Sequence, residues 1–301
     1  MKLAYIHTNT VRSSWTLWSG ARALRTLGYY VLDVTVPTDY IGRVVPRPLG
    51  RRPPGFPSLE ALEACDRVIV CAAEYCDPYL RELYGSAWDR LHKWAIMVES
   101  TDRGMPDCSR WYDRSFWPDP NDVLAVNDRQ LPSFVDTDMF CPADPDDPSC
   151  IKAIDVGFMG SMYQKRVEFL ADVQTPITCG QVSAFDMHGE AHEIWTRLYV
   201  DALRSMLIHV DLPSNNPMPT SRPLETLSAG TCLVTWAKLP EPLVEGYHYV
   251  RYTDASSLDR NLDALLEFPD RTKVFGRLGR DAVERNFRAL AGWRKVLDLG
   301  R

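Results

Sequence analysis

The sequence has no apolar run long enough to cross a membrane. A spanning helix needs about 18 or more consecutive uncharged residues, and no stretch of this chain approaches that length. The first ten residues, MKLAYIHTNT, contain one Lys and a short apolar run that turns polar at His7. They lack the apolar core and the cleavage site of a signal peptide. We therefore expect a cytoplasmic protein without a membrane span.

The chain also lacks the patterns of a cysteine-rich protein. Eight cysteines are scattered over 301 residues, and no two of them form a Cys-x-x-Cys pair. This spacing suits neither a disulfide framework nor a zinc site. We expect the thiols to be reduced, as is usual in the cytoplasm.

Basic charge is not in excess. The 34 Lys and Arg residues are outnumbered by 40 Asp and Glu residues, which gives a net charge of −6. A mildly acidic chain does not bind nucleic acid through its overall field, although a local basic patch is compatible with this charge. Apolar residues make up 45% and charged residues 25% of the chain, which excludes a disordered or fibrous protein. The length suits two domains.

Short apolar runs alternate with helical patterns along the first third of the chain. The run LAYIH at residues 3–7 is typical of a buried parallel strand, and a helix that Gly28 ends follows it. Further strands are predicted at residues 29–34, 67–72, 94–100 and 122–127. Strands separated by helices of this length indicate a parallel sheet that is covered on both faces.

A proline-rich segment at residues 141–150, CPADPDDPSC, is predicted to be an extended linker because it has no large apolar residue. The alternation resumes after it, with strands predicted at residues 154–161, 206–212 and 231–236 and with amphipathic helices at the end of the chain. We therefore predict two α/β domains. Ligands of such sheets bind at the carboxyl ends of the strands, so we expect the site in a cleft between the domains.

The segment at residues 215–236, NNPMPTSRPLETLSAGTCLVTW, contains the residues best suited to bind an anion. Thr220 or Ser221 can cap a short helix, whose free N–H groups and dipole favour phosphate. Arg222 would add a bidentate contact. Glu225 can accept hydrogen bonds from a ribose diol. As a capping-box acid it fits poorly, because that motif places the acid three residues after the cap and Glu225 is four residues after Ser221.

Three segments carry a family resemblance. They are SRPLETLSAGTCLVT at residues 221–235, FVDTDMFCP at residues 134–142 and DVGFMGSMYQKR at residues 155–166. They resemble, in order, the donor-binding segment, the end of the first domain and the opening of the second domain of nucleotide-sugar glycosyltransferases with the GT-B fold. The resemblance is closest to the group-one branch that includes CgeB-type proteins. It runs from about residue 134 to the C-terminus, and the first domain agrees only in its strand–helix rhythm.

This resemblance implies an α/β fold of two Rossmann-like domains with a cleft between them. It implies an acceptor-binding domain at residues 1–141, a nucleotide-sugar-binding domain at residues 142–284, and a helix at residues 285–301 that packs back on the first domain. The activity it implies is transfer of a hexose from a nucleotide-diphosphate sugar to an acceptor hydroxyl, with retention of configuration. Neither a metal nor a cofactor is expected, because the nucleotide sugar is a substrate.

The resemblance also implies roles for individual residues in the second domain. Glu225 matches the acid that binds the donor ribose, and Ser221 and Arg222 lie at the helix start that meets the diphosphate. Gly160 and Ser161 match the turn that lets the donor phosphates approach the backbone.

A basic pair follows that turn. Lys165 and Arg166 match cations that neutralise the leaving diphosphate, and the alternative is an ordinary solvated helix face. One position departs from the family pattern: many relatives have a second Glu where this chain has Pro217. Asn215 or Asn216 would then supply the contacts to the donor sugar, and our prediction is Asn216.

An Asp-x-Asp pair, Asp136 and Asp138, has the spacing of a manganese-binding motif in another glycosyltransferase fold. The residues on either side of the pair fit the signature that ends the first domain better, and two carboxylates alone supply too few ligands. We therefore predict no metal site here.

Acceptor-binding residues are expected at the strand ends of the first domain. His7, Asn9 and Arg12 follow the first strand, although a buried histidine at such a strand end is more often structural. Glu99 and Asp102 follow the strand at residues 94–100 and are the first and second candidates for a base that deprotonates the acceptor. A retaining reaction does not require that base.

Two basic stretches bear on the acceptor. Residues 42–57 contain four arginines, among them Arg51 and Arg52, and residues 109–119 alternate arginines with aromatic residues. Such loops suit DNA or an anionic glycan, and the alternative is an ordinary surface loop and core. Two rival functions therefore stay open. One is a DNA-modifying glycosyltransferase that acts on hydroxymethylated pyrimidine bases, and the other is a non-catalytic nucleotide-sugar-binding protein.

Overall fold

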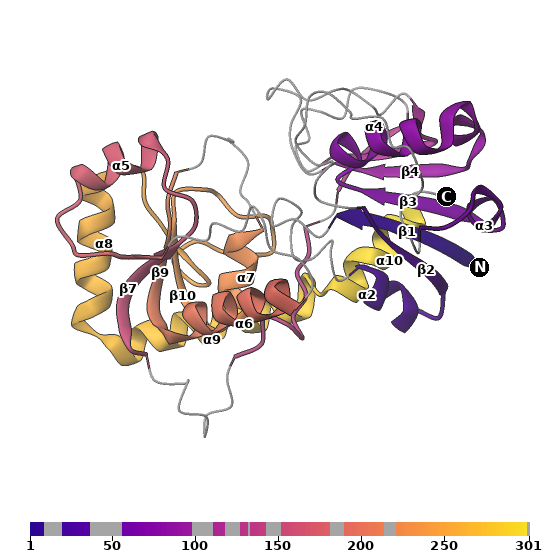
Figure 1. Ribbon diagram of the computed structural model, residues 1–301. Helices are drawn as coiled ribbons and strands as arrows, with labels where there is room; N and C mark the ends of the chain where they lie inside the picture. Colours follow the sequence, from indigo (N-terminus) through magenta and orange to yellow (C-terminus); the bar gives the residue numbers. More distant parts are fainter. Residues whose placement is uncertain are drawn as a thin grey trace. The chain divides into compact units, whose positions relative to one another are not determined.

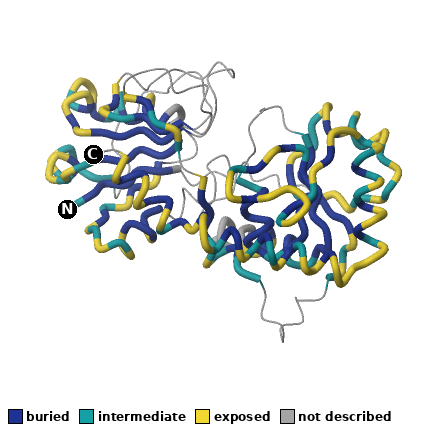
Figure 2. The backbone as a smooth tube through the Cα atoms, turned by 180° about the vertical axis from the view of Figure 1, so that it is seen from behind, coloured by how far each residue is buried: buried dark blue, intermediate teal, exposed yellow. Residues whose placement is uncertain are grey.

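A computed structural model describes residues 1–8, 20–36, 56–97, 111–117, 127–131, 133–142, 152–180, 190–213 and 221–299, without the side chains of residues 8, 74, 75 and 190–196. Two units make up the chain. Unit 1 comprises Met1–Pro132 and Ala289–Arg301, and unit 2 comprises Ser133–Arg288. In both units the central strands are buried, and exposed residues lie in the helices around them (Figure 2).

Unit 1 contains a six-stranded parallel sheet in the order β2-β1-β3-β4-β5-β6. Its strands are β1 (Lys2–Thr8), β2 (Tyr30–Val36), β3 (Arg67–Cys71), β4 (Lys93–Ile96), β5 (Arg114–Trp117) and β6 (Asp128–Gln130). The strand order reverses between β1 and β3, which is the place where ligands of open α/β sheets usually bind, outside the carboxyl ends of the strands.

The helices of unit 1 include the last one in the chain. They are α2 (Gly20–Thr26), α3 (Leu59–Glu63), α4 (Ala73–Tyr84), a 3-10 helix (Gly85–Arg90) and α10 (Ala289–Leu299). The fully buried Trp293 of α10 meets the Tyr5 ring edge-on at 5.4 Å. A Cβ atom at Gly20 would lie 2.6 Å from Trp293 Cζ2, so a glycine lets α10 pack closely against α2 (Figure 1).

Unit 2 contains a five-stranded parallel sheet in the order β11-β10-β9-β7-β8. Its strands are β7 (Ile154–Met159), β8 (Thr178–Gly180), β9 (Met206–Asp211), β10 (Cys232–Thr235) and β11 (Val250–Arg251). Its helices are α5 (Gln164–Ala171), α6 (Glu190–Ser205), α7 (Arg222–Ser228), α8 (Ala255–Glu267) and α9 (Pro269–Asn286).

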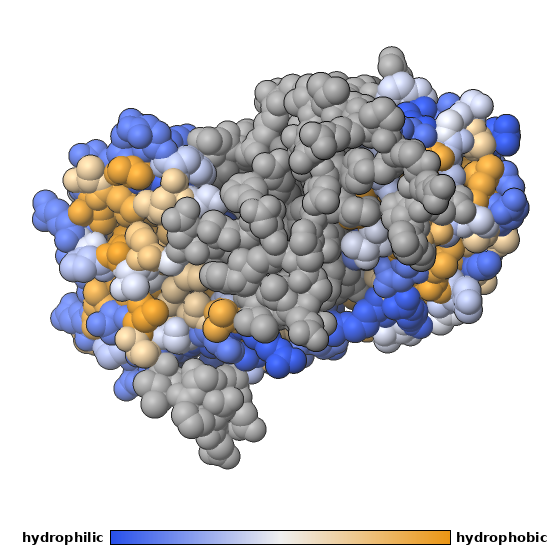
Figure 3. Space-filling model, in the orientation of Figure 1, coloured by the Kyte–Doolittle hydropathy of each residue, from blue (hydrophilic) through white to orange (hydrophobic). Residues whose placement is uncertain are grey.

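Leucines at helical spacing attach α8 to one face of this sheet. A capping box of Asp254 and Ser257 starts the helix, and Leu258, Leu262 and Leu265 pack into the core formed by β7, β9 and β10. Apolar surface gathers over the α5 and α8 side of the unit (Figure 3), where Phe169 is only partly buried. Helix α9 contacts β9 and β10 and also packs against α7.

The predicted α/β class, with one parallel sheet in each of two units, is confirmed. Two strands of unit 1 were not predicted: β5 lies within the stretch that we interpreted as a basic aromatic loop, and β6 follows the predicted strand at residues 122–127. Of that predicted strand only residue 127 lies within the described residues, and of the predicted linker at residues 141–150 only residues 141 and 142 do. The predicted amphipathic stretch at 281–299 is two helices, because α9 ends at Asn286 and α10 starts at Ala289.

No helix among the described residues is both long and apolar enough to cross a membrane.

Candidate functional site

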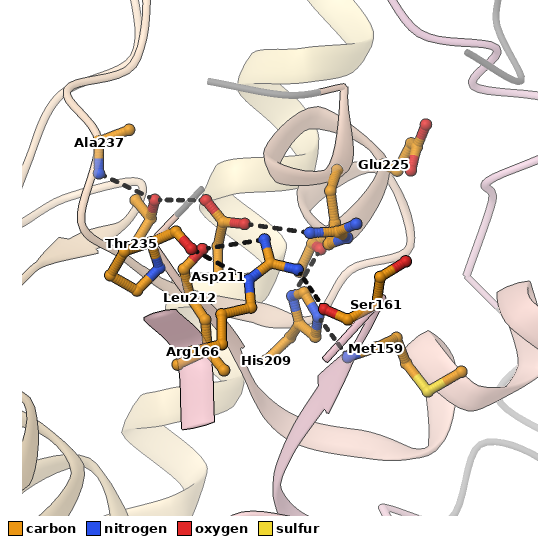
Figure 4. A network of polar contacts seen from close by, with 12 residues as sticks. Met159, Ser161, Arg166, His209, Asp211, Leu212, Glu225, Thr235 and Ala237 are labelled. Atoms are coloured by element: carbon orange, nitrogen blue, oxygen red, sulfur yellow. Dashed lines mark hydrogen bonds and ion pairs between the residues drawn. The ribbon is translucent and has the colours of Figure 1, made fainter. Parts of the chain in front are cut away.

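The carboxyl ends of β7 and β9 bring charged side chains together with the start of α7 in unit 2. Figure 4 shows this cluster, in which Arg166 and Asp211 lie beside the turn that contains Ser161. Glu225 lies one turn into α7, and most of these side chains are buried. Because charge is costly to remove from water, a buried cluster of charges has to be paired internally or by a ligand.

Arg222 and Asp211 form the central ion pair. Arg222 Nη1 lies 3.5 Å from Asp211 Oδ1, and their side chains are 19% and 3% exposed. Burial raises the pKa of Asp211, and the Arg222 guanidinium opposes that rise. Burial acts to lower the pKa of Arg222, but Tyr199 and Asp211 outweigh it and the pKa is raised. Arg222 is therefore a fixed cation with part of its surface open.

Asp211 is itself held in place from the neighbouring strand. Its Oδ2 atom accepts a hydrogen bond from Thr235 Oγ1 at 3.0 Å, and that hydroxyl oxygen accepts one from the Ala237 N–H at 3.2 Å. Asp211 is 2% exposed. The carboxylate therefore holds Arg222 through a chain of contacts that ends in backbone (Figure 4).

Gly160 lies at a turn where neighbouring side chains leave no room for a Cβ atom. Its N–H donates a hydrogen bond to Gly180 O at 3.0 Å. A Cβ atom at Gly160 would lie 2.8 Å from Phe158 Cζ and 3.0 Å from Arg222 Nη2, closer than side-chain carbons normally come. Only glycine leaves room for the Arg222 guanidinium at this turn, and the neighbouring Ser161 is exposed.

Lys165 and Arg166 have different surroundings in the structure. Lys165 is exposed, whereas Arg166 is 3% exposed. Arg166 donates hydrogen bonds to three carbonyl oxygens, those of Ser161 at 2.7 Å, Pro213 at 3.0 Å and Leu212 at 3.3 Å. Arg166 thus connects the Gly160 turn to the end of β9, and its guanidinium is occupied by backbone.

Glu225 is buried and only half satisfied. Its Oε2 atom accepts a hydrogen bond from the Tyr199 hydroxyl at 2.9 Å. Its Oε1 atom is buried and has no hydrogen-bond partner among the described residues. Burial raises the pKa of Glu225, and the Ser221 and Tyr199 hydroxyls oppose the rise. Ser221 makes no side-chain capping bond at the start of α7, so the alternative role of Glu225 in a capping box is absent.

His209 was not predicted from the sequence. Its Nε2 accepts a hydrogen bond from the Met159 N–H at 3.3 Å, so its Nδ1 carries the proton and lies 2.9 Å from Thr226 Oγ1. Burial, together with Arg222 and Arg166, lowers the pKa of His209 to about 3. The neutral ring connects β7 to α7. The histidine within the apolar run MLIHVDL was the signal that could have identified it.

Asp136 forms a turn. Its Oδ1 atom accepts hydrogen bonds from the N–H groups of Asp138 and Met139, both at 3.2 Å. Asp138 lies 3.8 Å from Arg288. Among the described residues, no group of three or more His, Cys, Asp or Glu side chains is placed to bind a metal ion.

His7 of unit 1 contacts an acid on the neighbouring strand. Its Nε2 lies 3.0 Å from Asp33 Oδ1 and 3.5 Å from Thr35 Oγ1, and its ring is 4% exposed. Burial acts to raise the pKa of Asp33, but His7 and Arg25 outweigh it, so the pKa is lowered. His7 therefore has the buried, hydrogen-bonded surroundings of a structural histidine, which was the alternative to a role in binding the acceptor.

The other predicted acceptor residues cannot be placed. Asn9, Arg12, Arg51, Arg52, Glu99 and Asp102 lie outside the described residues, as does the donor-side Asn216. The aromatic stretch is partly described. Tyr112, Phe116 and Trp117 are buried in unit 1 and Trp111 is 37% exposed, so most of these rings belong to the core.

The comparisons with known proteins agree with this architecture. Residues 165–298 match the model of a family described as glycosyl transferase-like. An alpha-glucosyltransferase, solved in complex with UDP-glucose and DNA containing an abasic site, is similar over 100% of this chain and 99% of its own, with a TM-score of 0.67 at 10% identity. No curated protein sequence matches the chain.

Two further solved structures have the same fold. HepE from Anabaena, in complex with UDP and glucose, is similar over 99% of this chain and 98% of its own, with a TM-score of 0.65 at 11% identity. Sucrose-phosphate synthase from Thermosynechococcus elongatus is similar over 99% and 98% of the two chains, with a TM-score of 0.61 at 13% identity. The chain therefore has the GT-B fold of these glycosyltransferases, and residues 165–298 match a glycosyl transferase-like family model.

Proposed function

We propose that the protein transfers a hexose from a UDP-sugar to an acceptor hydroxyl. The observation that carries this proposal is the pairing of a fixed cation, Arg222, with a buried carboxylate, Glu225, that has an oxygen without a partner among the described residues. A cation suits a diphosphate, and a carboxylate oxygen suits the hydroxyl donors of a ribose. UDP or UDP-glucose is the ligand of two of the similar structures.

In this proposal the chain acts on the leaving group. The bond between the sugar C1 atom and the diphosphate oxygen breaks, that oxygen takes the negative charge, and the acceptor oxygen bonds to C1. Arg222 stabilises the developing charge, which is the interaction that accelerates such a step. With retention of configuration, the acceptor proton passes to the departing diphosphate on the same face. The proposed reaction is metal-independent.

The test is a thermal-shift series with the full chain and UDP, ADP, GDP and UDP-sugars. Ligand at about 100 times its dissociation constant should add about 2.7 kcal/mol of stability. We expect UDP and its sugars to give this shift and Glu225→Ala to lose it. Glu267→Ala, at an exposed Glu of the same unit, is the matched control. A full UDP shift in Glu225→Ala, or no shift with any nucleotide in the parent protein, contradicts the proposal.

DNA is the second candidate acceptor. It is favoured by the similarity, over the whole chain, to an alpha-glucosyltransferase in complex with UDP and a 13-mer DNA containing an HMU base. Release of UDP from UDP-glucose should then depend on duplexes with hydroxymethylated pyrimidines and should not occur with unmodified duplexes. If the protein binds the donor but no acceptor leads to release of UDP, it is the non-catalytic binding protein that we kept as an alternative.

A further inference from the structure

Tyr199 and Glu225 form a buried pair that no other part of the proposed site explains. Tyr199 lies in α6 and Glu225 in α7, and the two residues are 4% and 2% exposed. The hydroxyl of Tyr199 donates to Glu225 Oε2 at 2.9 Å. A hydrogen bond to a charged group in a dry environment is among the stronger single contacts in a protein.

The phenol ring is fixed by its own packing. Phe140 meets the Tyr199 ring edge-on, with the ring centres 6.0 Å apart. Burial and the neighbouring Glu225 carboxylate raise the pKa of Tyr199 well above its usual range. The hydroxyl therefore keeps its proton at physiological pH and acts as a donor.

This bond determines which carboxylate oxygen is left. Oε2 is engaged by Tyr199, and Oε1 is buried without a partner among the described residues. Buried polar atoms are almost always hydrogen-bonded, so an orphaned carboxylate oxygen indicates a ligand that brings its own donor. A pair of neighbouring hydroxyl groups on a sugar ring supplies such donors without adding charge.

We infer that Tyr199 is a positioning residue that fixes the Glu225 carboxylate so that Oε1 accepts from the ribose hydroxyls of the nucleotide donor. The inference rests on the proposed function and deepens it. Tyr199 does not touch the ligand in this arrangement, because its hydroxyl is used by Oε2. Tyr199 also interacts with Arg222, so its action through Glu225 is measured by ribose preference and not by UDP affinity alone.

The experiment measures ribose discrimination by calorimetry on the full chain, with UDP, 2′-deoxy-UDP and 3′-deoxy-UDP as probes. We expect the parent protein to bind UDP about tenfold or more tightly than either deoxy analogue, and Glu225→Gln to lose most of this preference. Tyr199→Phe should weaken UDP binding about tenfold and reduce the preference for UDP over the deoxy analogues, since one hydrogen bond to a carboxylate is removed. The double variant should show the same ribose preference as Glu225→Gln alone.

Tyr249→Phe is the matched control. Tyr249 is 1% exposed in the same unit, and its hydroxyl accepts a hydrogen bond from the Leu239 N–H at 3.2 Å. Both Tyr→Phe variants should lose some stability, but only Tyr199→Phe should lose ribose preference.

The pH profile is a second readout. Removal of the Tyr199 donor raises the pKa of Glu225 further. As the pH is lowered, Tyr199→Phe should therefore lose UDP affinity at a higher pH than the parent protein.

Three outcomes overturn the inference. The first is a full ribose preference in Tyr199→Phe while Glu225→Gln loses it, with unchanged pH profiles. The second is a double variant whose ribose preference is smaller than that of Glu225→Gln alone. The third is a full preference in Glu225→Gln, which removes Glu225 from the ribose while UDP binding still supports the proposed function. Absence of UDP binding by the parent protein refutes the proposed function itself. If Tyr199→Phe does not fold, Phe140→Leu tests the same point, because it loosens the Tyr199 ring and should also reduce the preference.

Discussion

Replacement of Arg166 tests whether this arginine is a structural connection or a diphosphate ligand. Arg166→Met leaves the carbonyl oxygens of Ser161, Leu212 and Pro213 without their donor. A buried group that loses its partner costs about 1–3 kcal/mol. Burial and the Arg222 guanidinium lower the pKa of Arg166, so removing its charge recovers part of this cost. We expect a net loss of about 3–4 kcal/mol in the stability of unit 2.

The assay is thermal unfolding of the full chain without nucleotide. For a unit of roughly 150 residues, each kcal/mol shifts the midpoint by about 2–4 °C, so Arg166→Met should lower the unit 2 transition by about 10 °C. The unfolding midpoint of Arg166→Lys should lie between those of Arg166→Met and the parent, because an ammonium group reaches fewer of the three oxygens. The exposed neighbour supplies the control: Lys165→Met should change stability by no more than about 0.5 kcal/mol.

The reasoning is refuted if Arg166→Met unfolds with the parent protein, or if Lys165→Met lowers the midpoint equally. Either result would mean that the three carbonyl contacts do not hold the Gly160 turn against β9. The two positions would then be equivalent, as in the diphosphate-neutralising basic pair that the resemblance implied.

Two further changes test the surroundings of Arg222. Gly160→Ala would place a methyl group 2.8 Å from Phe158 Cζ and 3.0 Å from Arg222 Nη2. We expect a loss of about 1–3 kcal/mol in stability and UDP affinity about tenfold weaker by calorimetry; unchanged affinity contradicts the packing argument. His209 is neutral in the folded protein with a pKa of about 3, so its contribution is complete above pH 6.5, the usual histidine value, and falls by about 1.4 kcal/mol per pH unit below it. Urea unfolding between pH 7 and pH 5 should show this slope in the parent and not in His209→Gln, and equal slopes would refute it.

The sequence predicts most of the sheet positions well because strands buried on both faces are continuous apolar runs. LAYIH, RVIVC and MLIHVD all lie within β-strands of the structure. The strand RSFW was missed, because four residues flanked by charges give too short a pattern to separate from a loop. Its aromatic residues are buried by neighbours that are distant in sequence, and no local pattern reports this.

The site was predictable in composition and less so in geometry. Arg222, Glu225 and Gly160 were found because they lie in short motifs. The burial of Arg166 next to the exposed Lys165 was not found, because neighbouring residues of a helix point in different directions and the tertiary fold decides which of them is buried. The partners Tyr199 and Asp211 come from other elements, so their proximity arises only from the tertiary fold.

The path of the polypeptide chain makes unit 2 easier to exchange between related proteins than unit 1. Unit 2 is one uninterrupted segment, whereas unit 1 is assembled from both ends of the chain. A gene fragment that stops before Ala289 would omit Trp293 and strip Tyr5 of the ring that packs on it. A chimera that exchanges unit 2 with that of a relative therefore needs two splice points, one on each side of an insert, and the flanking pieces have to be inherited together.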